Sequence, residues 1–248
     1  MKKFIKTIFL ALLLGLFVSN SAHAKIYAVL VGVSEYRQSY NNLQFCAKDA
    51  MEMYNLLRLQ TSTDNLKLLT NTDATVANIT YHTRQLFEQS KPDDVVIFFF
   101  SGHGSPGEFN AHDGNLKFSV LRDVFKNTKA RRKLIFADAC YAGSLRTESP
   151  TISSNIYSNL GSNVLLFLSS RTDQTSREQS SLQNGVFTYY LLAGLKGGAD
   201  TNKNRKITAK ELFDFVNPQV KERTKNGQIP VMWGRFNKNM IIINWEQK

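Results

Sequence analysis

The chain alternates between short segments that are apolar throughout and longer segments whose apolar residues recur at helical intervals. Helices are predicted from about 47 to 57, 74 to 90, 186 to 196 and 208 to 217. Buried strands are predicted at 25–32, 66–70, 94–101, 132–139, 163–170 and 239–244. Strands that are apolar on both faces and alternate with amphipathic helices form mostly parallel sheets covered on both sides. The sequence therefore predicts a three-layer α/β domain.

The first 24 residues follow a different pattern. They combine three lysines, an apolar run from Ile8 to Val18 and the sequence Ala22-His23-Ala24. This is the layout of a secretory signal peptide cleaved after Ala24. The alternative is an uncleaved membrane anchor, but a spanning helix needs about 20 apolar residues. We therefore expect an exported protein, periplasmic or secreted, with one domain at 25–248 and no stable membrane association after cleavage.

Charge and cysteine content narrow the function classes. The formal net charge is +11, and the densest basic run is "KARRK" at 129–133. This run precedes an apolar strand and is interpreted as its solvated start, so no nucleic-acid partner is expected. The two cysteines, Cys46 and Cys140, are too few for a disulfide framework. Each therefore needs its own explanation.

Two of the predicted strands end in residues with catalytic chemistry. One runs into "SGHG", which holds His103 between two glycines, and the next runs into "DACYAGS", which holds Cys140. The carboxyl ends of parallel strands form the ligand-binding edge of an α/β sheet. Strands spaced about 4.8 Å apart would bring the two ends within roughly 5–10 Å. An imidazole there can take the thiol proton and later protonate a leaving amine, so the pattern indicates a Cys-His dyad.

Each of these residues also has a plainer interpretation. A lone cysteine is most often a small buried apolar residue, and a histidine between glycines can simply occupy a turn. The coincidence of both at strand exits favours catalysis. The remaining histidines lack that context, because they lie in the leader, in a predicted helix and in an "HDG" turn: His23, His82 and His112.

These segments resemble the caspase-like cysteine peptidases of family C14, in particular the metacaspase-type and bacterial members. The resemblance rests on "SGHG" and "DACYAGS" with "YAVLVGVSEY", "LQFCAKDA", "SSRTDQTSRE", "GVFTYYLLAGLKGGAD" and Gln228-x-Pro230 in family order. It implies a caspase-like fold with a mostly parallel six-stranded sheet, and cysteine-type endopeptidase activity on protein or peptide substrates. Tyr141 stands where many metacaspases have histidine.

The resemblance also implies roles for single residues. Cys140 would be the nucleophile and His103 the general acid/base. The backbone N–H groups of Gly104 and Cys140 would form the oxyanion hole, where each donor is worth about 3 kcal/mol. Asp138, two residues before the nucleophile, would recognise a basic P1 side chain, Arg or Lys.

Three further residues resemble the rest of that pocket: Ser101, Cys46 and Asp49. Cys46 and Asp49 are three residues apart at the start of a predicted helix and therefore share a face. Asp49 alone also fits an acid that is favourable in a first helical turn. If Cys46 lies beside Cys140, the two thiols can be oxidised together, and activity would depend on reductant.

The segment "DTNKNRKITAKE" at 200–211 has the spacing of a calcium-binding loop. Arg205 occupies the sixth position, where glycine is expected. Thr208 and Glu211 also form a capping box for the following helix. We favour a polar turn before a capped helix and expect no required cofactor, with Ca²⁺ binding kept as the alternative. The positions that would supply oxygens are Asp200, Asn202, Asn204, Lys206, Thr208 and Glu211.

Residues 143–163 are rich in Ser, Asn, Thr and Gly and predict a surface linker. The resemblance implies that it separates a large part, about 25–145, from a small part, about 163–248, and makes Arg146 a candidate processing site. An ordinary crossover loop is the alternative. The alternatives to an endopeptidase are an inactive binding or scaffold module, and an amidase or transpeptidase using the same site. The oligomeric state is left open.

Overall fold

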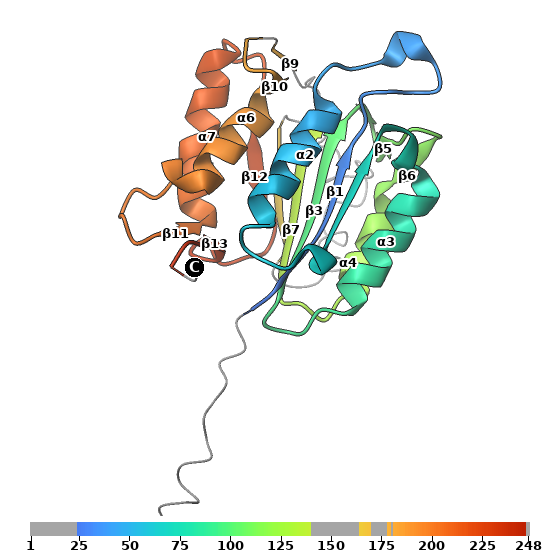
Figure 1. Cartoon of the computed structure of the whole chain (residues 1–248). Helices are drawn as coiled ribbons and strands as arrows, with labels where there is room; N and C mark the ends of the chain where they lie inside the picture. Colours follow the sequence, from blue (N-terminus) through green and yellow to red (C-terminus); the bar gives the residue numbers. More distant parts are fainter. Residues whose placement is uncertain (1–23, 140–163, 170–177, 180, 247–248) are drawn as a thin grey trace, which may run out of the picture.

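The computed structural model describes residues 24–139, 164–169, 178–179 and 181–246. Its centre is a six-stranded sheet in the order β12-β8-β7-β3-β1-β2 (Figure 1). The first five strands in chain order are parallel, and β12 runs antiparallel to β8. The mostly parallel six-stranded sheet is therefore confirmed. Its strands are β1 Ile26–Gly32, β2 Leu66–Thr70, β3 Val95–Gly102, β7 Arg132–Ala139, β8 Val164–Leu168 and β12 Val231–Trp233.

Helices cover both faces of this sheet (Figure 1). Alternate residues of β1 point to opposite faces, so Ala28 and Leu30 join the core under α2, α6 and α7, whereas Val29 and Val31 join the core under α3 and α4. The three predicted layers are present. The helices are α2 Cys46–Leu57, α3 Val76–Glu88, α4 Phe118–Asn127, α6 Val186–Ala193 with its π-helical continuation η5 Gly194–Gly198, and α7 Ala209–Arg223.

Short 3₁₀ helices and small antiparallel sheets accompany the central sheet and its helices. Three single-turn 3₁₀ helices, η1 to η3, are Ser39–Asn41, Thr63–Asn65 and Asn71–Asp73. A small antiparallel sheet joins β4 Gly104–Ser105, β5 Glu108–Asn110 and β6 Asn115–Lys117. Two further pairs join β9 Glu178–Gln179 to β10 Asn184–Gly185, and β11 Lys206–Thr208 to β13 Ile241–Asn244.

The neighbours β7 and β8 lie far apart in the sequence, on either side of residues 140–163. They nevertheless pair in parallel, from Lys133 opposite Val164 to Ala137 opposite Leu168. The rings of Phe136 and Phe167 extend this contact, with centroids 6.3 Å apart. The central sheet thus includes residues from both sides of that segment.

Three local predictions differ from the structure. The segment 239–244 does contain a strand, β13, but it pairs with β11 and lies outside the central sheet. The helix predicted to end at 217 continues through Pro218 to Arg223, because Val216 and Val220 on either side are buried in the core.

The third difference concerns the basic run at 129–133, which is not simply solvated. Lys133 is only 5% exposed, and its Nζ donates to the carbonyl oxygen of Phe125. Burial lowers the pKa of Lys133. The lysine therefore fixes the end of α4 to the start of β7 rather than adding to a basic surface.

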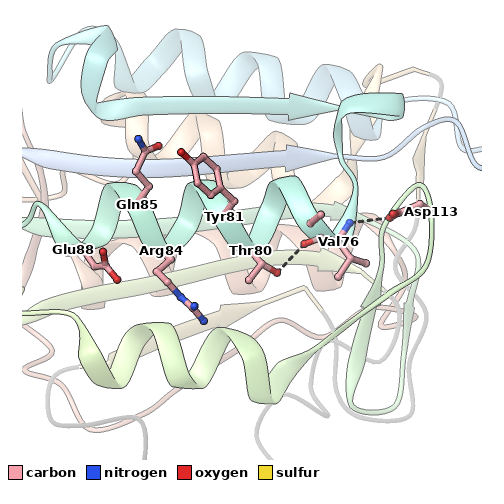
Figure 2. A pocket seen from close by; sticks show the side chains of 8 residues that line it. Val76, Thr80, Tyr81, Arg84, Gln85, Glu88 and Asp113 are labelled. Atoms are coloured by element: carbon pink, nitrogen blue, oxygen red, sulfur yellow. Dashed lines mark hydrogen bonds between the residues drawn. The ribbon is translucent and has the colours of Figure 1, made fainter.

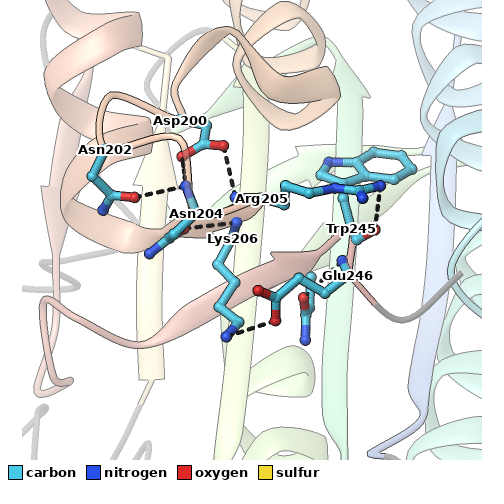
Figure 3. Close-up of polar contacts among 8 residues, drawn as sticks. Asp200, Asn202, Asn204, Arg205, Lys206, Trp245 and Glu246 are labelled. Carbon is cyan, nitrogen blue, oxygen red and sulfur yellow. Dashed lines mark hydrogen bonds and ion pairs between the residues drawn. The ribbon is translucent and has the colours of Figure 1, made fainter.

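The loop at 200–211 is held by its own side chains (Figure 3). Asp200 Oδ1 and Oδ2 accept the N–H groups of Asn204 and Arg205 at 3.1 and 2.8 Å. Arg205 adopts a φ of 61°, the turn conformation that usually favours glycine. Thr208 and Glu211 form the predicted capping box of α7. These contacts support the polar turn, and Ca²⁺ binding stays untested.

In the part of the chain that the structure describes, none of the helices has the length and apolar character needed to cross a bilayer. The same residues contain no group of three or more His, Cys, Asp or Glu side chains placed to hold a metal ion.

Candidate active site

The candidate site begins where β3 and β7 end side by side. Gly102 and Ala139 are the last pair in their parallel register. His103 is the next residue after β3, and Cys140 is the next residue in the sequence after β7. Cys140 lies outside the described residues, so the distance between imidazole and thiol stays a prediction. The neighbouring strands that the dyad requires are present.

The glycine before His103 has a steric cause. A Cβ added at Gly102 would lie 2.9 Å from the Tyr36 hydroxyl and 3.0 Å from the Phe100 ring. The Tyr36 hydroxyl occupies this space because it accepts the backbone N–H of His103 at 2.8 Å. The first glycine of "SGHG" therefore makes room for a contact that fixes the backbone at the histidine.

The imidazole of His103 is oriented by a second contact with the same loop. Its Nε2 lies 2.7 Å from the carbonyl oxygen of Asn41 in η1. A carbonyl oxygen only accepts, so Nε2 carries the proton and Nδ1 is the basic nitrogen of the neutral ring. The ring also contacts Tyr36, with centroids 4.9 Å apart. This tautomer leaves Nδ1 to exchange a proton with a thiol.

The loop that carries these partners is itself anchored. Asn71 Oδ1 accepts the N–H groups of Ser34 and Glu35 at 3.0 and 3.3 Å. His112 Nδ1 lies 2.8 Å from the Glu35 carbonyl oxygen. The N–H of Tyr36 donates to Asn42 Oδ1 at 2.9 Å. His112 thus has a structural role, because it helps to hold this loop in place from a distant part of the sequence.

We expect Tyr36→Phe to lower kcat by about fivefold to tenfold with little change in KM. The substitution removes one hydrogen-bond acceptor from His103, worth about 1 kcal/mol, without altering a substrate contact. The measurement is steady-state hydrolysis of a fluorogenic peptide. The matched control is Tyr81→Phe, because Tyr81 is an exposed residue of α3. Equal kcat values for both variants would contradict the positioning role.

A pair of buried carboxylates lies close to the same edge. Asp49 on α2 is 0% exposed and Asp138 on β7 is 4% exposed. Ser101 on β3 pairs with Asp138 in the strand register and donates from Oγ to Asp49 Oδ2 at 2.7 Å. The structure thus brings together three residues that the resemblance assigned to one pocket.

The strand β10 and the first turn of α6 supply further donors to these acids. Asn184 Nδ2 donates to Asp49 Oδ1 at 2.8 Å, and the N–H of Gly185 lies 3.2 and 3.3 Å from the two Asp49 oxygens. The N–H and Oγ1 of Thr188 donate to Asp138 Oδ2 at 3.1 and 2.9 Å. A Cβ at Gly185 would lie 2.3 Å from Asp138 Oδ2, so only glycine fits there.

Two carboxylates buried together resist double ionisation. Burial, and then the charge of Asp138, raise the pKa of Asp49 well above its usual value. The hydrogen bonds from Asn184, Ser101 and Gly185 oppose that rise. Without a cation the pair therefore resists carrying two negative charges, and a positively charged group would stabilise the doubly ionised form.

The other two candidate residues lie near these groups. Cys46 is buried in the first turn of α2, one turn before Asp49, and its carbonyl oxygen would lie 2.2 Å from a Cβ at Gly32. Gly104 begins β4 and pairs with Phe109, directly after His103. Their roles in the P1 pocket and in the oxyanion hole stay predictions.

Several sequence predictions lie outside the described residues. These predictions concern the leader up to residue 23, the role of Cys140 with its neighbour Tyr141, the linker with Arg146, and the proximity of Cys46 to Cys140. They are neither supported nor opposed by the geometry above.

A cavity of about 710 Å³ lies along α3, on the other face of the sheet from Asp49 (Figure 2). Two hydrogen bonds among the residues that line it stabilise the first turn of the helix. Asp113 Oδ1 accepts the first N–H of α3, from Val76, at 2.8 Å, and Thr80 donates to the Val76 carbonyl at 2.7 Å. This cavity contains none of the candidate residues.

Comparisons with known proteins agree with this architecture. Residues 25–241 match the family model of the caspase domain, peptidase C14. Among solved structures, the crystal structure of a protein from Geobacter sulfurreducens is similar, with a TM-score of 0.65 and 18% sequence identity over 86% of this chain and 94% of that one. At this identity the likeness shows the fold alone. No curated protein matches the chain significantly.

Proposed function

Because the chain belongs to the caspase-domain family, peptidase C14, we propose that it is a cysteine endopeptidase that cleaves peptide bonds after Arg or Lys. Cys140 attacks the scissile carbonyl carbon after His103 Nδ1 takes its thiol proton. The same imidazole then protonates the departing amine. Water hydrolyses the resulting thioester. The N–H groups of Gly104 and Cys140 stabilise the oxyanion.

The observation that carries the specificity is the buried pair Asp49 and Asp138. Both carboxylates are buried at the carboxyl edge of the sheet and accept hydrogen bonds from neutral groups: Asp49 from Ser101, Asn184 and Gly185, and Asp138 from Thr188. A guanidinium that binds beside the two acids would offset their mutual repulsion and form charge-assisted hydrogen bonds. Arg is expected to exceed Lys, because its planar fork can engage both carboxylates.

The test is a library of fluorogenic peptides that differ only at P1, hydrolysed by the purified chain from residue 25 to 248. Cleavage after Arg, weaker cleavage after Lys and none after Asp supports the proposal, because an acidic side chain would meet like charge in a dry pocket. Preferential cleavage after Asp would overturn it. Transfer to added amines instead of water would identify a transpeptidase.

A further inference from the structure

The amino-terminal edge of the sheet contains a buried carboxylate that the proposed chemistry does not use. Asp94, directly before β3, is 6% exposed. Its Oδ2 accepts the N–H of Lys91 at 2.7 Å, and its Oδ1 accepts the backbone N–H of Lys25 at 2.8 Å. Lys25 is the residue that follows the expected cleavage point, Ala24.

This contact lies where β1 and β3 begin to pair. The N–H of Val95 donates to the Lys25 carbonyl oxygen at 2.8 Å, and Ile26 pairs with Val95 in the register. Asp94 therefore holds the first residue of the ladder against the strand beside it. The candidate active site is at the opposite, carboxyl end of the same strands.

We propose that removal of the leader after Ala24 creates an ion pair between the new α-ammonium group of Lys25 and Asp94, which fastens the mature N-terminus to the sheet. The proposal rests on export and cleavage, and it is independent of the peptidase function. A signal-peptide endopeptidase adds water across the Ala24–Lys25 bond. The Ala24 carbonyl becomes a carboxylate, and the Lys25 nitrogen leaves as an amine that takes up a proton at neutral pH.

The ion pair is favourable because Asp94 is already buried before cleavage, so forming the pair removes no further water from the carboxylate. In both forms the carboxylate is buried and accepts the Lys25 nitrogen, so cleavage changes a neutral donor into a charged one. Charge-assisted hydrogen bonds are roughly twice as strong as neutral ones. Lys25 is exposed, so the ammonium group keeps water on its other protons. Its own desolvation is therefore small.

Arg132 on β7 also acts on Asp94 through its charge, since Asp93 and Asp94 both oppose the lowering of the Arg132 pKa by burial. The hydrogen bond of its guanidinium nevertheless goes to the carbonyl oxygen of Asp93, and Arg131 approaches the Asp93 carboxylate at 3.9 Å. Asp94 contributes to raising the pKa of Tyr27 on β1, after burial. Ala24 lines a cavity of about 250 Å³ with Arg132, so space beside the new terminus is available to water.

The test compares a chain that begins at Lys25 with one that begins at Ala24, each released from a cleavable fusion. Both have an α-ammonium group, but only the first has it at Asp94. We expect the Lys25 chain to unfold about 2–4 °C higher at pH 6.5. In the Asp94→Asn background, which keeps an acceptor oxygen but no charge, the two chains should unfold within about 1 °C of each other.

The pH dependence gives a second readout that needs no substitution. An α-amino group in an unfolded chain has a pKa of about 7.7–8.0, and a carboxylate partner raises it in the folded state. The stabilisation is therefore complete below about pH 7 and is lost as the pH rises through the folded value. Equal unfolding temperatures of the two chains at pH 6.5, or a difference unchanged at pH 10, would overturn the proposal.

Discussion

Peptide cleavage is expected to fall by about 10⁴-fold or more in Cys140→Ala and by about 10³-fold or more in His103→Ala. The first variant would lack the proposed nucleophile, and the second would lack the group proposed to remove and return the proton. The measurement is kcat/KM on an Arg peptide, with circular dichroism to verify the fold. Folding should persist, because His103 follows the end of β3 and is only half-buried.

The matched control for the histidine is His82→Ala, because His82 lies on α3, on the face of the sheet opposite Asp49. Its kcat/KM should stay within about twofold of the unsubstituted chain. A folded Cys140→Ala protein that still cleaves the Arg peptide would contradict the proposal of a cysteine peptidase. If the unsubstituted chain cleaves no peptide and reacts with no thiol-directed peptidyl-arginine probe, an inactive scaffold is the better interpretation.

The second large effect is expected at the acid pair. Asp138→Asn should lower kcat/KM for Arg peptides by about 30-fold or more, since removing one partner of a desolvated charge pair costs about 2–5 kcal/mol. The same substitution should raise the unfolding temperature, because Asp49 can then ionise without a second buried carboxylate beside it. An amide oxygen can still accept from Thr188. Lower activity with higher stability separates a binding role from damage to the fold.

The control for this prediction is Glu52→Gln, which removes a carboxylate from α2, one turn after Asp49. The Glu52 side chain is 32% exposed, forms an ion pair with Lys48 at 3.0 Å and accepts from Asn184 at 3.4 Å, a hydrogen bond that the glutamine amide oxygen can still accept. We expect its kcat/KM for Arg peptides to change less than threefold, because solvent screens an exposed pair. Arg cleavage that is unchanged in Asp138→Asn would show that the acids do not line the pocket.

The sequence predicted most of the central sheet because its strands are apolar on both faces. The bounds of β2 and β7 were predicted without error. By contrast, β12 has only three half-buried residues and no pattern that distinguishes it from a loop. The end of α7 was missed because the rule that proline ends a helix yields here to the burial of the residues around Pro218.

The candidate site was predictable only in part. His103 could be found from its place after an apolar strand, and the acids were named from the resemblance. Tyr36 and Asn41 were missed, because they contact His103 across 67 and 62 residues of sequence. The sequence holds only an indirect sign of the Tyr36 contact, which is the glycine at position 102. No larger residue fits at that position, because the Tyr36 hydroxyl lies there. Contacts of this range need the fold before they can be assigned.

The ladder between β7 and β8 determines how the protein would behave after a cut within residues 140–163. The two products would be joined by the five register pairs of that ladder and by the core, without a covalent bond. Refolding would then be an association of two chains, so the unfolding temperature would rise with protein concentration. Dilution would lower the fraction of the cut protein that stays assembled, whereas the folded fraction of the uncut chain would not depend on concentration.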